Sequence, residues 1–423
     1  MCYAIPGQVV EINSKTVTVE YFGEKKKAIN EIAELKAGDF IYAQGGYVIK
    51  VVPEPEALAT LELWKETFFE LRETDLRLSR RPKEETGIGN DLSLILDKAA
   101  EGRELKREEL LKLLATEKPA ELDQLFKTAN FLRQKYLSNS CCVHGIIEFS
   151  NYCRHDCVYC GIRKSNSILK RYRMSEEEIV EAAGEAIEKH GFKALVLQSG
   201  EDQEYQVDRV VGVIKEIKKR YPVLIFISVG EVGREGLQKF YDAGARGVLT
   251  RFETSDPKLY ANLHCGDKLE ERLQNIRDAY SLGYLVLTGG LIGLPGQSIE
   301  SLLDDILLTK ELNAEMYSFG PVLPYGPKTE LVLKVLAVSR LVDPKNARIL
   351  VTTGFETLEP SAQKLGLMAG ANSVMLNVTP LKYRKLYEIY PGRAHAEETI
   401  EAQIKATLDL LYSLGRAPTD LGI

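Results

Sequence analysis

The chain of 423 residues is long enough for two or three domains with a large core. Its net charge of −6 lacks the basic excess that is typical of nucleic-acid-binding proteins, so we expect no nucleic-acid partner. Seven cysteines are too few for a disulfide framework, and free thiols favour a reducing compartment, so we expect a cytoplasmic protein. No apolar run of about 20 residues and no signal-peptide pattern stands out, so we expect no membrane association.

The first fifty residues alternate between apolar and polar side chains, with glycines between the alternating runs. This pattern predicts short strands joined by tight turns, as in a small β-barrel. A helix is predicted over about 54–76, and we assign residues 1–76 to a first domain and residues 77–91 to a linker rich in charge, proline and glycine. The predicted strands cover residues 8–12, 16–21, 39–43 and 47–51.

Helical periodicity marks residues 92–140 as a helical lead-in. Strands and helices then alternate through residues 141–395, and a C-terminal helix is predicted within 396–423. Eight evenly spaced strand–helix units favour an α/β fold of the closed (β/α)8 TIM-barrel type, with an open doubly wound sheet as the alternative. The predicted strands are 145–149, 194–197, 224–228, 247–250, 284–287, 316–319, 349–351 and 373–376.

Three cysteines, Cys153, Cys157 and Cys160, form the pattern C-x3-C-x2-C after the first predicted barrel strand. Three thiolates can bind three irons of a [4Fe–4S] cluster and leave the fourth iron open to a small molecule. A zinc site is an alternative, but structural zinc takes four protein ligands and no second C-x2-C pair follows. A second alternative is a disulfide between two of these cysteines, with the third left as a free thiol. We expect His155, between two of these cysteines, to face solvent.

The other thiols in this part of the chain are expected to be buried small side chains rather than ligands. They are Cys141, Cys142 and Cys265.

Polar or glycine-rich sequence follows every predicted barrel strand. A (β/α)8 barrel builds its active site at the C-terminal ends of its strands, so these segments are expected to meet on one face, beside the cysteine loop. The segments are 198–202, 228–231, 251–254, 289–296, 320–325, 352–353 and Asn377.

The cysteine segment, with Tyr159 before the last cysteine and a glycine after it, resembles the radical S-adenosylmethionine (SAM) superfamily. The resemblance implies a [4Fe–4S] cluster whose open iron is chelated by SAM. Ser199, Gly200 and Glu201 resemble the second-strand motif that holds the methionine amino group of SAM. Gly293 resembles the glycine segment that lies against adenine, and Tyr159 is implied to lie near the adenine edge. The alternatives are a solvated loop acid for Glu201, a strand cap for Gly293 and ordinary packing for Tyr159.

The barrel further resembles the HydE-type maturases of [FeFe]-hydrogenase, whose relatives are biotin synthase and methylornithine synthase. The resemblance implies that Ser228 and Glu253 contact the ribose or methionine part of SAM and that Arg272 binds its carboxylate. A surface ion pair with Glu270 or Glu271 is the alternative for Arg272. The matching segments are 146–153, 160–163, 170–174, 197–202, 251–254, 293–297, 352–353 and 379–384.

The same resemblance implies that Arg251, Thr352 and Thr353 line a substrate cavity that favours anions. Two departures from the HydE pattern, Gly247 in place of arginine and Phe226 in place of threonine, are expected to remove polar groups from that cavity. No cysteine follows Cys265, so we expect a single cluster.

The N-terminal domain resembles the HypC family, small β-barrel chaperones of [NiFe]-hydrogenase assembly. The matching residues are 1–7, 38–40 and 46–47. The resemblance implies that Cys2 occupies the iron-carrying position, while Gln44 stands where the family has a histidine. A glutamine is a poor iron ligand, so docking or handover is favoured over metal carriage, and an inert terminal thiol is the alternative for Cys2.

The leading hypothesis is a radical SAM enzyme that reductively cleaves SAM to a 5′-deoxyadenosyl radical. It would act in hydrogenase metallocofactor maturation on a small-molecule or organometallic iron–cysteine substrate, which the HypC-like domain would help to deliver or receive. The implied partners are hydrogenase maturation proteins and an electron donor such as ferredoxin or flavodoxin. An amino-acid mutase or synthase related to methylornithine synthase is the second hypothesis, and a non-catalytic assembly scaffold is the third.

Overall fold

The N-terminal segment closes into a small barrel in the computed structural model, which describes residues 3–32, 34–81, 89–323 and 325–422. The strand order is β1-β2-β3-β5-β4, and the barrel closes where Gly7 pairs with Ile41. In addition to the four predicted strands there is a further strand, β3, whose lysine-rich sequence hides the alternation that marks a strand. The strands are β1 (Gly7–Asn13), β2 (Thr16–Tyr21), β3 (Glu24–Ile29), β4 (Phe40–Gln44) and β5 (Tyr47–Val52).

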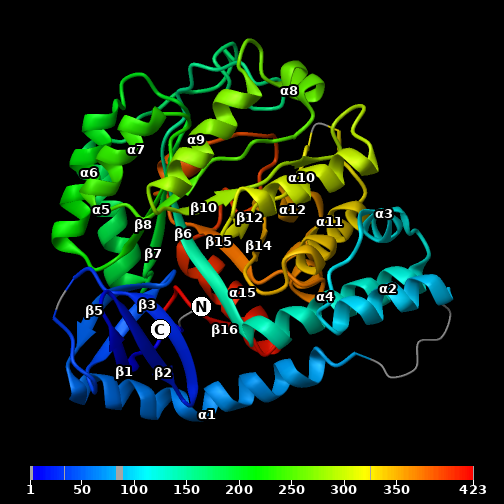
Figure 1. The fold of residues 1–423 in the computed structure, drawn as a ribbon. Coiled ribbons are helices and arrows are strands. Elements are labelled where there is room, and N and C mark those ends of the chain that lie inside the picture. Colours follow the sequence, from blue (N-terminus) through cyan, green and yellow to red (C-terminus); the bar gives the residue numbers. More distant parts are fainter. Residues whose placement is uncertain (1–2, 33, 82–88, 324, 423) are drawn as a thin grey trace.

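A long helix, α1 (Glu54–Leu78), leads away from this small barrel along the base of the molecule (Figure 1). Phe68 and Leu71 of α1 pack into the same apolar cluster as the strands. Its last turn is tied to the lead-in helices by a buried ion pair between Asp75 and Arg133, 2.6 Å apart. Residues 82–88 of the predicted linker lie outside the described residues. The lead-in helices are α2 (Asn90–Ala100), α3 (Arg107–Ala115) and α4 (Pro119–Leu137).

Eight parallel strands close into the predicted (β/α)8 barrel, because the last strand, β15, pairs with the first, β6. Closure excludes the open doubly wound sheet. The barrel strands are β6 (Ser140–Ser150), β7 (Ala194–Ser199), β8 (Leu224–Ser228), β9 (Gly247–Leu249), β10 (Leu285–Thr288), β12 (Met316–Tyr317), β14 (Arg348–Val351) and β15 (Ser373–Asn377). Two short strands, β11 (Leu291–Ile292) and β13 (Gly320–Pro321), pair with each other beyond β10 and β12.

Helices cover the outside of the barrel and bury their apolar faces against it (Figure 1). They are α5 (Glu176–Gly184) with its π-helical extension η1 (Glu185–Lys189), α6 (Val207–Arg220), α7 (Gly233–Ala243), α8 (Pro257–Leu263), α9 (Leu269–Ser281), α10 (Ile299–Glu311), α11 (Thr329–Val342), α12 (Thr353–Leu358), α13 (Ala362–Met368), α14 (Leu381–Arg384) and α15 (Ile400–Ser413). After α15 the chain returns as β16 (Ala417–Pro418), parallel to β6. Among the helices described, none has the length and apolar character needed to cross a membrane.

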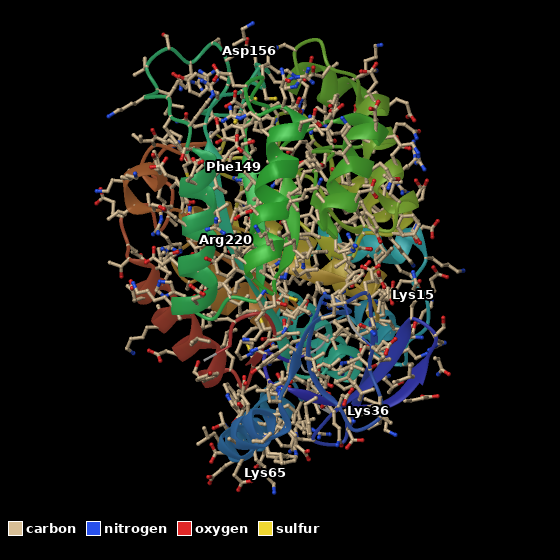
Figure 2. The ribbon with its side chains drawn as sticks, turned by 90° about the vertical axis from the view of Figure 1, so that its left-hand side faces the viewer. Lys15, Lys36, Lys65, Phe149, Asp156 and Arg220 are labelled. Carbon is tan, nitrogen blue, oxygen red and sulfur yellow. The ribbon has the colours of Figure 1, made fainter. Side chains whose placement is uncertain are left out.

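The small barrel docks against the N-terminal ends of the large barrel's strands. The β4–β5 turn enters the barrel so closely that a Cβ on Gly45 would lie 2.6 Å from Leu224. Tyr47 packs in the apolar cluster of the barrel interior and donates a hydrogen bond to the Gly283 carbonyl, 3.2 Å away. Figure 2 shows Asp156 of the cysteine loop at the opposite end of the molecule from Lys36 and Lys65 of the N-terminal domain. The N-terminal domain therefore covers the end of the barrel opposite the cysteine loop.

Candidate functional site

A cavity of about 330 Å³ lies at the C-terminal ends of the barrel strands. Ile146, Leu249, Leu350 and Met375 form its floor and belong to the apolar cluster that fills the barrel. The cysteine loop after β6 lines the cavity, together with polar loops from the other strands. The face predicted for the active site is therefore the face that holds a cavity.

All three motif cysteines line this cavity and are half-buried. The loop is held by backbone hydrogen bonds, one of them from Gly161 N–H to the Ile389 carbonyl (2.7 Å). Gly161 itself has no room for a side chain, because a Cβ would lie 2.0 Å from the Glu388 carbonyl oxygen. Burial, opposed by a backbone hydrogen bond, raises the pKa of Cys160 to about 12, so a bound metal has to displace the thiol protons.

This donor set fits three irons of a [4Fe–4S] cluster. Three thiols share one short loop, the cavity lies beside them, and no fourth cysteine among the described residues lines it. A closed zinc site would need a fourth protein ligand. The cluster interpretation therefore fits better than the zinc or disulfide alternatives.

The loop after β7 presses against the cysteine loop. A Cβ on Gly200 would lie 2.2 Å from the Tyr152 carbonyl oxygen and 2.9 Å from Cys153 Cβ, so only glycine fits. The adjacent Ser199 lines the same cavity. The packing brings Glu201 beside the motif cysteines, as the sequence predicts.

The Glu201 carboxylate is a charged acceptor at the cavity wall. It accepts hydrogen bonds from the Glu231 N–H (2.9 Å) and from Arg154 Nε (2.9 Å), and it lies 2.8 Å from His155 Nε2. Burial opposes ionisation, but the hydrogen bonds from His155 and Glu231 prevail and lower the pKa of Glu201. Glu201 is thus no solvated loop acid.

The prediction that His155 faces solvent is wrong. Its ring lies between Glu201 and Asp267, with Nδ1 2.8 Å from the Asp267 carboxylate, and it lines the cavity. Two carboxylates on opposite sides of one imidazole hold it inward, a tertiary arrangement that the spacing of the cysteines does not encode.

Arg251 and Glu253 form an ion pair deep in the cavity, with Nε 3.0 Å from Oε2. Glu253 adopts a left-handed backbone conformation (φ +69°), which a non-glycine residue rarely does and which is typical of functional sites. Tyr159 donates a hydrogen bond to the other Glu253 oxygen (3.3 Å). These three predicted residues are brought together.

Arg272 also reaches the cavity, where its Nε lies 2.6 Å from the Glu231 carboxylate. The surface alternative fails because Glu270 pairs with Arg277 and Glu271 pairs with Lys268. Arg272 is therefore a half-buried guanidinium that lines the cavity with the cysteine loop.

The remaining predicted residues separate into two groups. Thr352 and Thr353 line the cavity. Only a glycine fits at position 320 beside Thr352 and Arg251, because a Cβ there would lie 2.9 Å from the Thr352 hydroxyl. Ser228 at the end of β8 and Gly293 are not among the described residues that line it. Gly293 instead donates its N–H to the Gln297 side chain (2.8 Å) in the turn before α10.

Sequence reasoning missed a second buried ion pair at the cavity. Arg393, which lines the cavity, donates to the fully buried Glu148 (2.8 Å), and Asn377 donates to the same carboxylate (2.8 Å). A signal was available, because a lone glutamate inside an apolar strand requires a buried partner. The partner lies 245 residues away, so its identity was not readable.

His264 is another missed residue. Its Nδ1 lies 3.4 Å from Cys157 Sγ, and its ring stacks on Tyr260 with centroids 4.3 Å apart. Burial lowers the pKa of His264 to about 4, so the ring is neutral beside the thiol.

The segment after α14 closes one side of the cavity and is held by His395. This histidine lies 3.3 Å from Glu356 and 3.0 Å from Glu398. The hydrogen bond to Glu356 is the main cause that raises the pKa of His395, against its burial, to about 9.

Several predictions concern residues that lie away from the cavity. The prediction that Gly247 and Phe226 remove polar groups from the substrate cavity is wrong, because neither residue lines the cavity. Phe226 lies towards the N-terminal domain, and a Cβ on Gly247 would lie 1.8 Å from the Phe226 ring. Cys265 is exposed rather than buried, whereas Cys141 and Cys142 are buried as expected. Gln44 is buried and donates to the Tyr3 carbonyl (3.4 Å). The Cys2 hypothesis falls outside the described residues.

Comparisons with known proteins agree with this architecture. The profile of the Radical SAM superfamily matches residues 147–308, and that of the HupF/HypC family matches residues 1–64. The chain is 40% identical over 334 residues to the [FeFe] hydrogenase maturase subunit HydE of Thermotoga maritima, covering 77% of this chain and 94% of the relative. It is 30% identical over 342 residues to 3-methylornithine synthase of Methanosarcina acetivorans, covering 78% and 94%.

Among solved structures, that of methylornithine synthase (PylB) superposes with a TM-score of 0.69 at 27% identity. The match covers 77% of this chain and 97% of that chain.

Proposed function

The chain belongs to the radical SAM superfamily, within the group that includes the HydE-type maturases, and we propose that it matures a hydrogenase metallocofactor. It is a radical SAM enzyme that uses a [4Fe–4S] cluster and SAM. The proposed substrate is a small anionic iron–cysteine species. The observation that carries the proposal is the cavity itself, which three free thiols line together with carboxylates and half-buried arginines.

We propose that Cys153, Cys157 and Cys160 hold the cluster. When bound, the cluster and SAM supply an electron and a sulfonium whose reductive cleavage gives a 5′-deoxyadenosyl radical. The protein's own contribution is to orient SAM and to exclude water from the cavity.

The charged groups of the cavity match the charged groups of SAM. Glu201 offers a carboxylate to the ammonium group, and Arg272 offers a guanidinium to the carboxylate, each next to the cysteine loop. Ser199 and Gly200 support this end of SAM from the β7 loop.

On the nucleoside side, Glu253 is proposed to accept from the ribose hydroxyls, with Ser228 as a further contact. Tyr159 is proposed to border the adenine, with Gly293 as the backbone surface behind it. Since neither Ser228 nor Gly293 lines the cavity, their contacts require bound SAM to reach beyond it.

The deeper part of the cavity is proposed to bind the substrate. Arg251 and Arg393 line it with Thr352 and Thr353, so two guanidiniums and two hydroxyls are available to an anionic ligand. Arg251 also pairs with Glu253 and Arg393 with Glu148, so the proposed ligand carries only a small net negative charge.

We propose that residues 1–76 act as a docking module for other hydrogenase maturation proteins and that residues 141–395 form the catalytic unit. The docking module lies at the end of the barrel opposite the cysteine loop, so direct delivery into the cavity is disfavoured. An electron donor such as ferredoxin or flavodoxin would instead approach the cysteine loop. These partners and a cytoplasmic location belong to the same proposal.

The experiment measures SAM cleavage by the anaerobically reconstituted protein with dithionite. Release of 5′-deoxyadenosine or an adenosylated product is expected. Cys157→Ala is expected to abolish it, whereas Cys265→Ala, which changes an exposed thiol outside the cavity, should retain it. Full activity of Cys157→Ala would overturn the assignment.

A second candidate, radical chemistry on a free amino acid, is favoured by the superposition with methylornithine synthase. The carboxylate and the ammonium group of such an amino acid would match the paired charges of Arg251 and Glu253. If ferrous iron with cysteine stimulates 5′-deoxyadenosine formation more than any free amino acid, the maturase proposal stands. Stimulation by an iron-free amino acid would favour the second candidate.

A further inference from the structure

Three side chains of metal-ligand type gather at the other end of the barrel, beneath the N-terminal domain. Ligand atoms of Cys142, His144 and Asp420 all lie within 4.8 Å of one another. The three residues are 4%, 3% and 2% exposed, so this cluster is shielded from bulk water. None of them lines the cysteine cavity.

The fold brings them together by strand geometry. Cys142 and His144 are two residues apart on β6, so their side chains point to the same side of the strand. Asp420 follows β16, which runs parallel to β6, and it accepts hydrogen bonds from Val143 N–H (3.3 Å) and the Thr419 hydroxyl (2.7 Å). These hydrogen bonds hold the carboxylate in one position, as hydrogen bonds from neighbouring groups commonly do for the ligands of a metal ion.

Two observations point to a ligand. A separate small cavity of about 20 Å³, large enough for one atom or water, is lined by Cys142, His144 and Asp420. In addition, His144 Nδ1 is buried and has no hydrogen-bond partner among the described residues. An unsatisfied buried ring nitrogen costs free energy, which a ligand in this small cavity would recover.

We propose that Cys142, His144 and Asp420 bind one divalent first-row transition ion. A thiolate, an imidazole and a carboxylate suit zinc or ferrous iron, and three protein ligands leave a fourth position for a water or small ligand in the adjoining cavity. Gly45 of the β4–β5 turn forms part of the cavity wall, so the site is complete only when the N-terminal domain is docked. The ion would therefore lie next to the contact between the two domains.

The competing explanation is a simple ion pair, because His144 Nε2 lies 3.2 Å from the Asp420 carboxylate. A bound ion would take the place of this pair, with His144 and Asp420 as two of its ligands. The ring is further oriented by Phe226, stacked on it with centroids 5.0 Å apart.

The test uses the full chain with its cluster reconstituted, so that the motif cysteines are occupied, and adds zinc. After gel filtration, wild type is expected to retain about one zinc per chain and to melt at a higher temperature than without zinc. Cys142→Ser and Asp420→Asn are each expected to lose the zinc and the melting shift. Cys141→Ser, which changes the neighbouring buried thiol, is the matched control and should keep both.

Cluster content and the rate of SAM cleavage report folding in each variant, since this site is separated from the cysteine cavity. A parallel experiment adds 57Fe²⁺ to protein whose cluster holds natural iron; a high-spin ferrous Mössbauer signal that Asp420→Asn removes would identify iron as an occupant. If folded wild type binds no zinc and no ferrous iron, or if the variants bind as much as wild type, the ion pair is the correct explanation and the proposal is wrong.

Discussion

Replacing Gly230 by alanine tests whether the position of the Glu201 carboxylate controls SAM binding. A Cβ at Gly230 would lie 1.9 Å from Glu201 Cγ and 2.2 Å from its Cδ, closer than non-bonded atoms approach. The carboxylate would have to leave the position in which the Glu231 N–H holds it. Gly230 also has φ +82°, so alanine is strained there whatever the space.

Gly233 separates these two effects. It has φ +68° and no atom within 4 Å of its Cβ position, so Gly233→Ala carries the backbone strain alone. Strain of this kind costs about 1–2 kcal/mol of stability at either position. Displacing Glu201 additionally removes a charge-assisted hydrogen bond to the SAM ammonium, worth about 1.5–3 kcal/mol, which corresponds to a roughly 10- to 150-fold weaker Kd.

The assay is equilibrium binding of SAM to the reconstituted protein, together with the initial rate of 5′-deoxyadenosine formation and the melting temperature. Both variants should melt at lower temperature than wild type, and only Gly230→Ala should bind SAM weakly. Equal SAM affinities in the two variants would refute the role of Glu201.

The remaining predictions concern stability and domain docking. Glu148→Gln is expected to lower the free energy of unfolding by about 3–5 kcal/mol, because it leaves Arg393 charged and buried. In denaturant titrations, adding Arg393→Met should restore part of that loss. If the losses of the two single variants simply add in the double variant, the pairing is contradicted. The free energy of unfolding is expected to decrease as pH rises from about 6.5 to about 9, because His395 then loses the proton that its carboxylate partners stabilise. His395→Gln should remove this part of the pH dependence of the melting temperature. If the melting temperature of the variant depends on pH as strongly as that of wild type, other groups cause the effect. Gly45→Ala is expected to loosen the docked N-terminal domain and speed its limited proteolysis. Gly46→Ala, also at positive φ but with open space around it, should not; equal rates would show that the turn does not hold the domains together.

The fold was largely predictable because its signals are local. Each barrel strand is an apolar run bounded by glycine or polar residues, and this periodicity is set by neighbouring residues. The strand β3 escaped prediction because Lys26, on its less exposed side, is a lysine like the exposed Lys25 and Lys27, which masks the alternation. Of the predicted site residues, those on loops directly after a strand, such as Glu201, Arg251 and Thr352, line the cavity, since the barrel brings those loops to one face.

By itself, the sequence determined the cysteine spacing, the eight strand–helix units and the small N-terminal barrel. Only the tertiary structure decided which charges meet: Arg393 reaches Glu148, His155 turns inward, and Asp420 joins Cys142 and His144. It also placed Phe226 at the docking end of the barrel instead of in the cavity. The physical reason is that local periodicity depends on adjacent residues, whereas these contacts join segments that the closed barrel brings together. Arg393 meets Glu148 only when β15 pairs with β6, and Asp420 meets Cys142 only when β16 returns beside β6.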